Sequence, residues 1–176
     1  FNQIECEEGP FAKRLANWIA TELAPETVLD IGCGPGTYVR ALRTAGIEAI
    51  GIDTDERVLD QAHLYQRSLF ELGSQAELVI CLEVAEHIDP AQTEEIAKCV
   101  TDAILPGGHL IWSAAQPGQG GVGHINCRPR SDWEELFAAQ GLSRCIETEN
   151  KLREDMRSGY HMGWFYNNAI VLTKMG

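Results

Sequence analysis

Residues 28–53, VLDIGCGPGTYVRALRTAGIEAIGID, place a glycine-rich turn between a short apolar run and a segment with helical periodicity. A second short apolar run then ends at Asp53. Apolar runs of this length that end at glycine or aspartate are typical of buried strands. We therefore expect a strand, a glycine turn, a helix and a second strand, with the backbone of the turn close to any bound ligand.

The alternation of strand-like and helical segments continues along the chain. Further strand character appears at 68–72, 77–84, 109–114, 142–147 and 168–173. Helical character appears at 10–23, 56–65, 89–104 and 131–141. Asp89 before Pro90 is expected to cap one helix, and Ser131 with Glu134 is expected to form a capping box. Strands that alternate with helices predict an α/β fold with an open, doubly wound and mostly parallel sheet.

Composition limits the class of protein. The chain has 176 residues, of which 44% are hydrophobic and 23% charged, so we expect one domain over residues 1–176. A net charge of −12 disfavours a nucleic acid partner. No apolar run approaches the roughly 18 residues of a membrane span, and the start at Phe1 shows no targeting segment. Six cysteines without C-x-x-C spacing indicate reduced thiols, so we expect a cytoplasmic protein. We expect it to be a monomer or a homodimer.

The spacing of the glycines separates two classes of ligand. Glycines stand at 32, 34 and 36, whereas the dinucleotide-binding pattern would place the third glycine at position 37, which is Thr37. This spacing favours a nucleoside joined to an amino acid, such as S-adenosylmethionine, over NAD. Asp53 serves either class, because a carboxylate at the end of the second strand accepts hydrogen bonds from ribose hydroxyls.

Four segments, VLDIGCGPGTY, GID, ELVICLEVAEHI and LPGGHLIWSAA, resemble the successive motifs of the class I S-adenosylmethionine-dependent methyltransferases. The resemblance implies a seven-stranded, Rossmann-like sheet whose last strand is antiparallel. It implies a helical segment over 1–24, a cofactor-binding core over 25–115 and a substrate side over 116–176. The cofactor-binding residues that it implies are Asp30, Gly32, Cys33, Gly34, Gly36, Asp53, Thr54, Ser68, Leu69, Leu82 and Glu83.

Within that set, the resemblance places Asp30 and the glycines around the methionine part of the cofactor, Asp53 on the ribose and Thr54 near the adenine. Ser68, followed by Leu69, stands where many relatives carry an aspartate that binds the adenine amino group. A serine hydroxyl or a backbone group would take over that contact.

Methyl transfer requires the acceptor to be aligned with the methyl group and, for a hydroxyl, deprotonated. His87 and His124 are the candidate general bases or orienting groups. Alternatively, Glu83, Glu86, His87 and His124 bind Mg or Mn. The spacing E-x-x-E-H resembles the metal-binding segment of the ubiquinone-pathway O-methyltransferases and of the small-RNA 3'-end methyltransferases, but metal-free relatives share LEVxEH. In a third interpretation, these residues only form a turn.

Two later segments are candidates for the acceptor side. The glycine-rich loop 116–130 is either a lid over the substrate or a surface loop. Segment 151–166 either shapes a pocket for an anionic or aromatic substrate or covers a hydrophobic edge, through Arg153, Arg157, Tyr160, Trp164 and Tyr166. We therefore predict transfer of a methyl group to an oxygen or nitrogen of a small molecule. The alternatives are a divalent-metal-dependent O-methyltransferase and a non-catalytic protein of the same fold that binds the cofactor or a partner.

Overall fold

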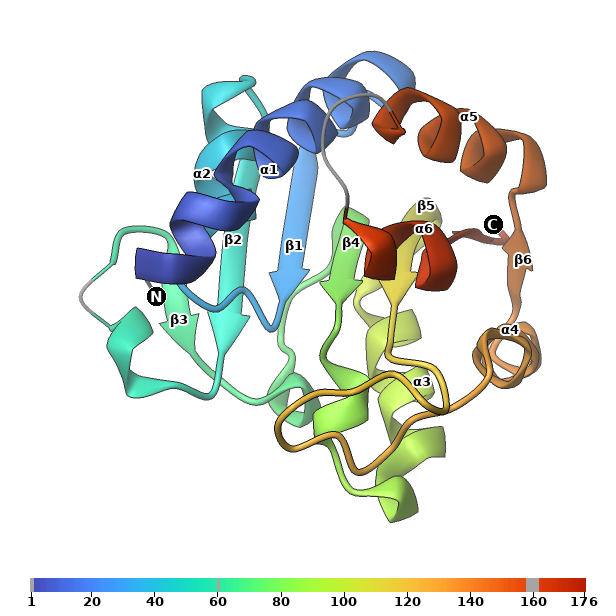
Figure 1. Cartoon of the computed structure of the whole chain (residues 1–176). Coiled ribbons are helices and arrows are strands. Elements are labelled where there is room, and N and C mark those ends of the chain that lie inside the picture. Colours follow the sequence, from blue (N-terminus) through green and yellow to red (C-terminus); the bar gives the residue numbers. More distant parts are fainter. Residues whose placement is uncertain (1, 60, 158–161) are drawn as a thin grey trace.

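The computed structural model describes residues 2–59, 61–157 and 162–176. One sheet has the strand order β3-β2-β1-β4-β5-β7-β6 (Figure 1). The strands are β1 (Thr27–Ile31), β2 (Glu48–Asp53), β3 (Leu64–Gln66), β4 (Ala76–Leu82), β5 (Ile104–Ser113), β6 (Leu142–Arg144) and β7 (Ile170–Lys174). The pairs among β1 to β5 are parallel, and β7 is antiparallel to both of its neighbours. The predicted doubly wound sheet with an antiparallel last strand is confirmed.

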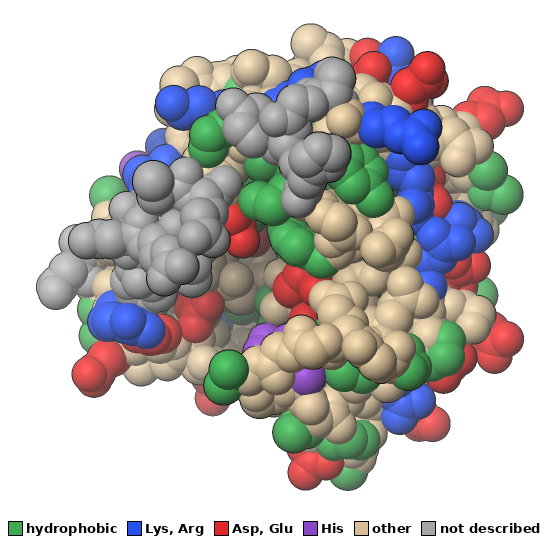
Figure 2. All heavy atoms as spheres, viewed as in Figure 1, with side chains coloured by type: hydrophobic (Ala, Val, Ile, Leu, Met, Phe, Trp, Pro, Cys, Tyr) green, Lys and Arg blue, Asp and Glu red, His purple; other side chains and the backbone are tan. Residues whose placement is uncertain are grey.

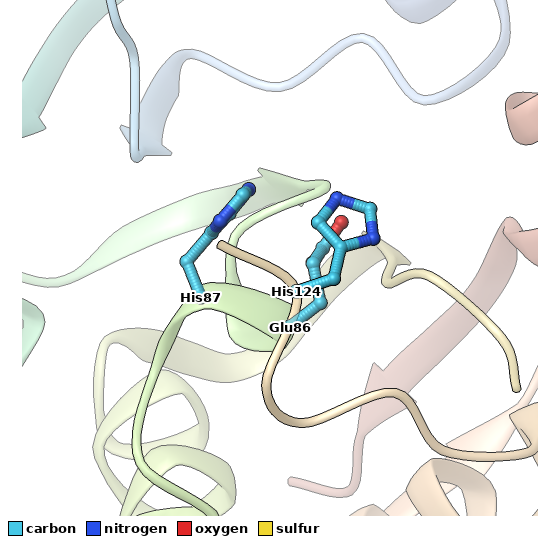
Figure 3. A group of neighbouring side chains, drawn as sticks. All are labelled: Glu86, His87 and His124. Carbon is cyan, nitrogen blue, oxygen red and sulfur yellow. The ribbon is translucent and has the colours of Figure 1, made fainter. Parts of the chain in front are cut away.

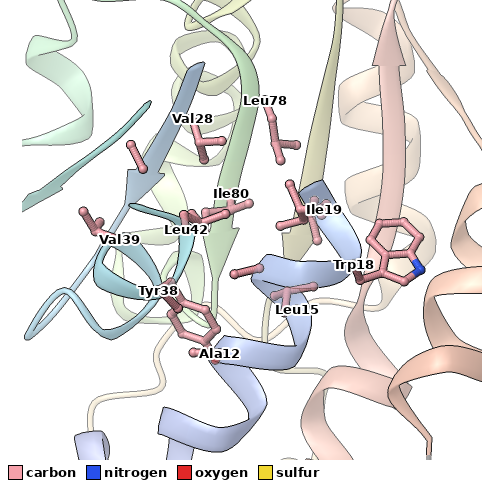
Figure 4. Close-up of a cluster of buried hydrophobic side chains, with 14 of the residues drawn as sticks. Ala12, Leu15, Trp18, Ile19, Val28, Tyr38, Val39, Leu42, Leu78 and Ile80 are labelled. Carbon is pink, nitrogen blue, oxygen red and sulfur yellow. The ribbon is translucent and has the colours of Figure 1, made fainter. Parts of the chain in front are cut away.

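Helices cover both faces of the sheet. The helices are α1 (Asn2–Glu22), α2 (Thr37–Thr44), α3 (Thr93–Asp102), α4 (Arg130–Ala139), α5 (Ile146–Met156) and α6 (Gly163–Asn168). Side chains alternate along β4, so Leu78 and Ile80 join the core under α1 and α2, while Val79 joins the core under α3 and α4. Figure 4 shows the first of these cores, with Leu15 and Ile19 of α1 directed at the sheet. Strands with apolar residues on both faces must be covered on both sides, as here.

The strand order reverses at β1, which has β2 on one side and β4 on the other. Ile31 of β1 lies beside Cys81 of β4, so the turns that follow these two strands emerge together. In open α/β sheets, ligands bind outside the carboxyl ends of the strands at such a reversal. The fold therefore brings the glycine turn after β1 next to Glu83, which follows β4.

Residues 56–72 differ from the prediction. The expected helix 56–65 is a single 3₁₀ turn, Glu56–Val58, which begins where the Asp55 carboxylate accepts a hydrogen bond from the Arg57 amide at 2.9 Å. The expected strand 68–72 lies earlier, at β3, and Leu69–Glu71 is another 3₁₀ turn. β3 has three residues and is stabilised by its pairing with β2. Because this pairing is not local, the periodicity of the sequence does not indicate it.

Two further boundaries differ. The expected strand 142–147 ends at Arg144, because the chain turns into α5. The expected capping box is wrong: α4 begins at Arg130, and the Ser131 hydroxyl contacts Asp132 instead of the backbone. Glu134, the other half of that box, pairs with arginine side chains.

Other expectations hold in part, with shifted boundaries. The Asp89 carboxylate accepts a hydrogen bond from the Ala91 amide at 2.9 Å, and Pro90 opens the 3₁₀ turn that leads into α3. α1 starts earlier than the expected position 10 and continues through Pro10. The five cysteines whose side chains are described are free thiols, as expected. No helix in the described ranges is both long and apolar enough to cross a membrane.

Candidate active site

Two cavities adjoin at the carboxyl ends of the central strands. The larger, about 330 Å³, is lined by Gly32, Asp53, Thr54, Ser68, Leu69, Glu83 and His87 among the predicted site residues. The smaller, about 160 Å³, is lined by Asp30, Gly32, Cys33, Gly34, Leu82 and Glu83. Gly32 and Glu83 belong to both cavities. Figure 2 shows histidine and acidic side chains around a hollow on this face.

The turn after β1 needs glycine at position 32. Gly32 has φ +73°, and a Cβ atom there would lie 2.2 Å from Val84 Cγ2. The amides of Gly32 and Cys33 both donate to the Ile52 carbonyl, at 2.9 and 3.0 Å. These contacts fix the turn against the end of β2 and leave no room for a side chain.

Gly36 is the one predicted cofactor residue that lines neither cavity. It precedes α2 with φ +77°, and a Cβ atom there would meet the Leu64 side chain at 2.7 Å. Its position therefore serves the packing of α2 against β3.

Asp30 is a buried carboxyl group with 3% exposure. Its Oδ2 atom has no hydrogen-bond partner among the described residues. Burial, and then the charges of Asp53 and Glu8, raise the pKa of Asp30 to about 8. A cation placed in the smaller cavity would favour the ionised form of this group.

Asp53 holds the glycine turn in place. Its Oδ2 atom accepts a hydrogen bond from the Gly34 amide at 2.8 Å, and its Oδ1 atom accepts one from the Asp55 amide at 2.9 Å. Each carboxylate oxygen can accept more than one hydrogen bond, so both oxygens retain capacity toward the larger cavity. The sequence predicted the cofactor role of Asp53 and missed this structural one.

Thr54, Ser68 and Leu69 also line the larger cavity. The Ser68 hydroxyl accepts a hydrogen bond from the Phe70 amide at 3.3 Å, which caps the 3₁₀ turn that follows. Arg67 and Phe70, which were not identified from the sequence, line the same cavity. Their signal lay only in their position beside Ser68.

Glu83 connects the cavities to the loop after β5 and to α6. Its backbone has φ +54°, which is uncommon for a residue other than glycine. The carboxylate accepts hydrogen bonds from Gln119 at 2.9 Å and from Asn168 at 3.0 Å. Neither amide residue was identified from the sequence, because 36 and 85 residues separate them from Glu83.

Glu86, His87 and His124 form a cluster whose potential ligand atoms all lie within 4.8 Å of one another (Figure 3). The imidazole rings meet edge to face, with centroids 4.9 Å apart. The structure thus brings together three of the four predicted metal ligands, and Glu83 is not part of this group. His87, which follows β4, and His124, in the loop after β5, therefore lie side by side.

Glu86 is the unusual member of the cluster. It is fully buried, and neither carboxylate oxygen has a hydrogen-bond partner in the described part of the chain. Burial, followed by the charge of Glu83, raises the pKa of Glu86 to about 7. Nδ1 of His124 is also buried and without a described partner. A buried carboxylate without partners is costly, unless a cation or another donor completes the site.

The loop that carries His124 is anchored at its second half. The amides of Ile125 and Asn126 donate to the Glu86 carbonyl, at 2.8 and 3.0 Å. The Asn126 side chain is buried and donates to the Ala85 carbonyl at 3.3 Å. These bonds hold the loop beside the cluster, and its function as a lid stays a prediction.

The residues predicted for the acceptor side differ in their contacts and in whether they line a pocket. Arg153 is bound to Glu149 and to the carbonyls of Tyr166 and Ala169. Trp164 lines a pocket beside the cavities. Tyr160 lies outside the described residues.

A protein-family model described as a methyltransferase domain matches residues 7–146. The chain belongs to the methyltransferase domain family. A ubiquinone biosynthesis O-methyltransferase of Acinetobacter baylyi is 32% identical to this methyltransferase domain over 150 residues. The match covers 74% of this chain and 58% of that protein, so the chain spans less than two thirds of the length of this relative.

Solved structures agree with the fold of the methyltransferase domain. A SAM-dependent methyltransferase from Archaeoglobus fulgidus superposes with a TM-score of 0.70 at 18% identity, covering 99% of both chains. Magnesium protoporphyrin IX methyltransferase from Synechocystis PCC 6803, with bound SAH, gives 0.70 at 18% identity and covers 98% of this chain and 86% of its own. Family and fold together confirm the prediction of a class I S-adenosylmethionine-dependent methyltransferase.

Proposed function

We propose that this domain transfers the methyl group of S-adenosylmethionine to an oxygen or nitrogen of a small molecule. The observation that carries the proposal is the pair of adjoining cavities, which all predicted cofactor residues except Gly36 line. The match covers only 58% of the Acinetobacter relative, so the acceptor has to be identified by experiment.

The residues around the cavities suit the parts of this cofactor. When bound, S-adenosylmethionine supplies a methyl group already activated by its sulfonium charge. Asp30 and the glycine turn would hold the cationic methionine part, since the field there favours positive charge. Asp53 would accept hydrogen bonds from the ribose, and Thr54 with Ser68 would lie at the adenine.

His87 would act on the acceptor. Its side chain lines the larger cavity and is exposed, and the His124 ring lies against it. An imidazole at this position can accept the proton of an acceptor hydroxyl while the cavity aligns the nucleophile with the methyl group.

Asp53→Ala tests this arrangement. We expect the KM for S-adenosylmethionine to rise at least about tenfold, the equivalent of about 1.4 kcal/mol, because the ribose contact and the anchor of the Gly34 amide are both lost. Asp55→Ala removes a neighbouring carboxylate that does not line the cavities and should change the KM little. The measurement is transfer of labelled methyl groups to a panel of hydroxyl and amino compounds. If the intact protein labels no compound, the non-catalytic alternative gains support.

A second candidate function, metal-assisted O-methylation, is favoured by the cluster at Glu86. One carboxylate and two imidazoles are ligands that divalent cations accept, and the unpartnered atoms of Glu86 and His124 fit such a role. Glu86, His87 and His124 would hold the ion, which would supply a positive charge for acceptor oxygens. Glu83, the fourth predicted ligand, would bind the ion only after losing its hydrogen bonds to Gln119 and Asn168.

Metal-stripped protein should then bind Mn²⁺, and the affinity should rise as the pH increases from about 6 to about 8. The reason for this sign is that the raised pKa of Glu86, about 7, keeps the carboxyl protonated at lower pH, and the ion requires the carboxylate. Glu86→Gln should abolish binding. The loss of the free Mn²⁺ signal in electron paramagnetic resonance measures it.

A pair of adjacent glycines provides the control for this experiment. A Cβ atom at Gly121 would lie 2.1 Å from His124 Nε2, whereas one at Gly120 would meet nothing within 4 Å. Gly121→Ala should therefore displace the His124 ring and weaken Mn²⁺ binding, while Gly120→Ala should not. Absence of binding to the intact protein, or equal binding by all variants, would remove the metal hypothesis.

A further inference from the structure

A third cavity, about 490 Å³, opens between the loop after β5 and α6. It is lined by Gln116, Gln119, Trp164, Asn167 and Asn168. Four of these side chains are carboxamides, and the fifth is an indole. The cofactor cavities have a different chemistry, since acidic groups line them.

Hydrogen bonds join this amide-lined pocket to the cofactor cavities through Glu83. Gln119 and Asn168 each donate to one Glu83 oxygen, at 2.9 and 3.0 Å, and Asn168 also donates to Gln119 at 2.9 Å. Asn168 is buried, with 1% exposure. Glu83 itself lines both of these cavities, so its side chain links the amide-lined pocket to them.

The pocket retains groups that can bind a ligand. Gln116 donates to the Asn167 carbonyl and to Asn168 Oδ1, each at 3.1 Å, so its own Oε1 atom is left as an acceptor. The exposed Asn167 carboxamide also lines the pocket, and it offers both a donor and an acceptor. The half-buried Trp164 offers a flat apolar surface, held by an edge-to-face contact with Phe11.

Charge selects the kind of molecule that fits. Among the described residues, none that lines the pocket is charged, and the charge linked to it by hydrogen bonds is the negative one of Glu83. Arg153, expected to attract an anionic substrate, is bound to Glu149 instead. An anion would lose its hydration in this pocket without gaining a positive partner.

We propose that the amide-lined pocket holds the ring of the methyl acceptor, a neutral compound with several hydroxyl groups. The reacting hydroxyl would extend past Glu83 into the larger cavity, which His87 also lines. This inference rests on the proposed methyltransferase function. Hydroxyls on adjacent ring atoms would pair with the amides of Gln116 and Asn167, and the ring face would lie on Trp164. A sugar and a catechol share this chemistry.

The test measures binding of four probes to the intact protein saturated with S-adenosylhomocysteine, by saturation-transfer NMR at millimolar concentration. Catechol and methyl glucoside are the neutral probes, and protocatechuate and glucuronate are their charged counterparts. We expect at least one neutral probe to bind, and its charged counterpart to bind about tenfold more weakly or not at all. The probe that binds shows whether the ring is aromatic or saturated.

Asn167→Ala should lower the affinity for the neutral probe about three- to tenfold, as expected for the loss of a hydrogen bond. The matched control is Asn150→Ala, at an exposed asparagine of α5, which should have no effect. S-adenosylhomocysteine should bind both variants as it binds the intact protein.

The inference is overturned if S-adenosylhomocysteine binds but neither neutral probe does, or if charged probes bind equally well. It is also overturned if Asn167→Ala and Asn150→Ala behave alike. If S-adenosylhomocysteine itself does not bind, the proposed function fails, and the acceptor site fails with it.

Discussion

Asp30→Asn should produce a protein that is more stable at alkaline pH and yet binds S-adenosylhomocysteine poorly. Asp30 is nearly inaccessible to solvent, its Oδ2 atom has no described partner, and its pKa is raised to about 8 by burial and then by Asp53 and Glu8. A carboxyl group that costs stability in the ligand-free protein is explained by a ligand that needs it.

The sign of the pH dependence follows from the two states. The unfolded protein loses the Asp30 proton near pH 4, whereas the folded protein keeps it up to about pH 8. Between these limits, the contribution of Asp30 to the free energy of unfolding falls as the pH rises. Asparagine does not titrate, so the advantage in stability of Asp30→Asn over the intact protein should grow by more than about 2 kcal/mol between pH 5 and pH 8.

Urea unfolding at several pH values measures this difference, and calorimetry measures the binding of S-adenosylhomocysteine. Glu48→Gln, at an exposed carboxyl of β2, serves as the control and should leave both quantities near those of the intact protein. The account of Asp30 is wrong if Asp30→Asn is less stable at pH 8 or binds S-adenosylhomocysteine normally.

Gly32→Ala should lower the affinity for S-adenosylhomocysteine at least about a hundredfold and the free energy of unfolding by about 2–4 kcal/mol. Its new Cβ atom would lie 2.2 Å from Val84, in a backbone conformation with φ +73° that disfavours alanine. Gly32 lines both of the adjoining cavities that we assign to the cofactor, so a shift of the turn changes both.

A control separates the two costs. Gly46→Ala has a comparable φ of +90° but open space around its Cβ, so only the backbone cost of about 1–2 kcal/mol should appear, without effect on ligand binding. Adding Val84→Ala to Gly32→Ala should restore part of the stability, because it removes the atoms in contact. Normal ligand binding by Gly32→Ala would show that the turn does not form the cofactor site.

The sequence was sufficient for the parts of the fold whose signals are local. β1 and β4 are short apolar runs buried on both faces, and Asp89 with Pro90 is a compact helix start. The strand expected at 68–72 was misplaced, because β3 is stabilised by its pairing with β2 and not by a local pattern. The predicted capping box of Ser131 and Glu134 was wrong, because Glu134 pairs with Arg130 and Arg144 instead.

The residues of the candidate site also fall into those that local motifs predict and those that they do not. Asp30 and Asp53 lie at the carboxyl ends of β1 and β2, and the glycines follow β1, so the sequence pattern was enough to predict that they lie together. The link from Glu83 to Asn168 spans 85 residues, and nothing in the sequence pattern around Asn168 signals it. The extent of the domain, the cytoplasmic location and the monomeric or homodimeric state stay predictions.

Calorimetric titration of the intact protein with S-adenosylhomocysteine is the most direct test of the cofactor site. The account predicts one molecule bound per chain with a dissociation constant in the micromolar range, roughly 8 kcal/mol of binding free energy. Absence of binding to folded protein would contradict the assignment of the two adjoining cavities.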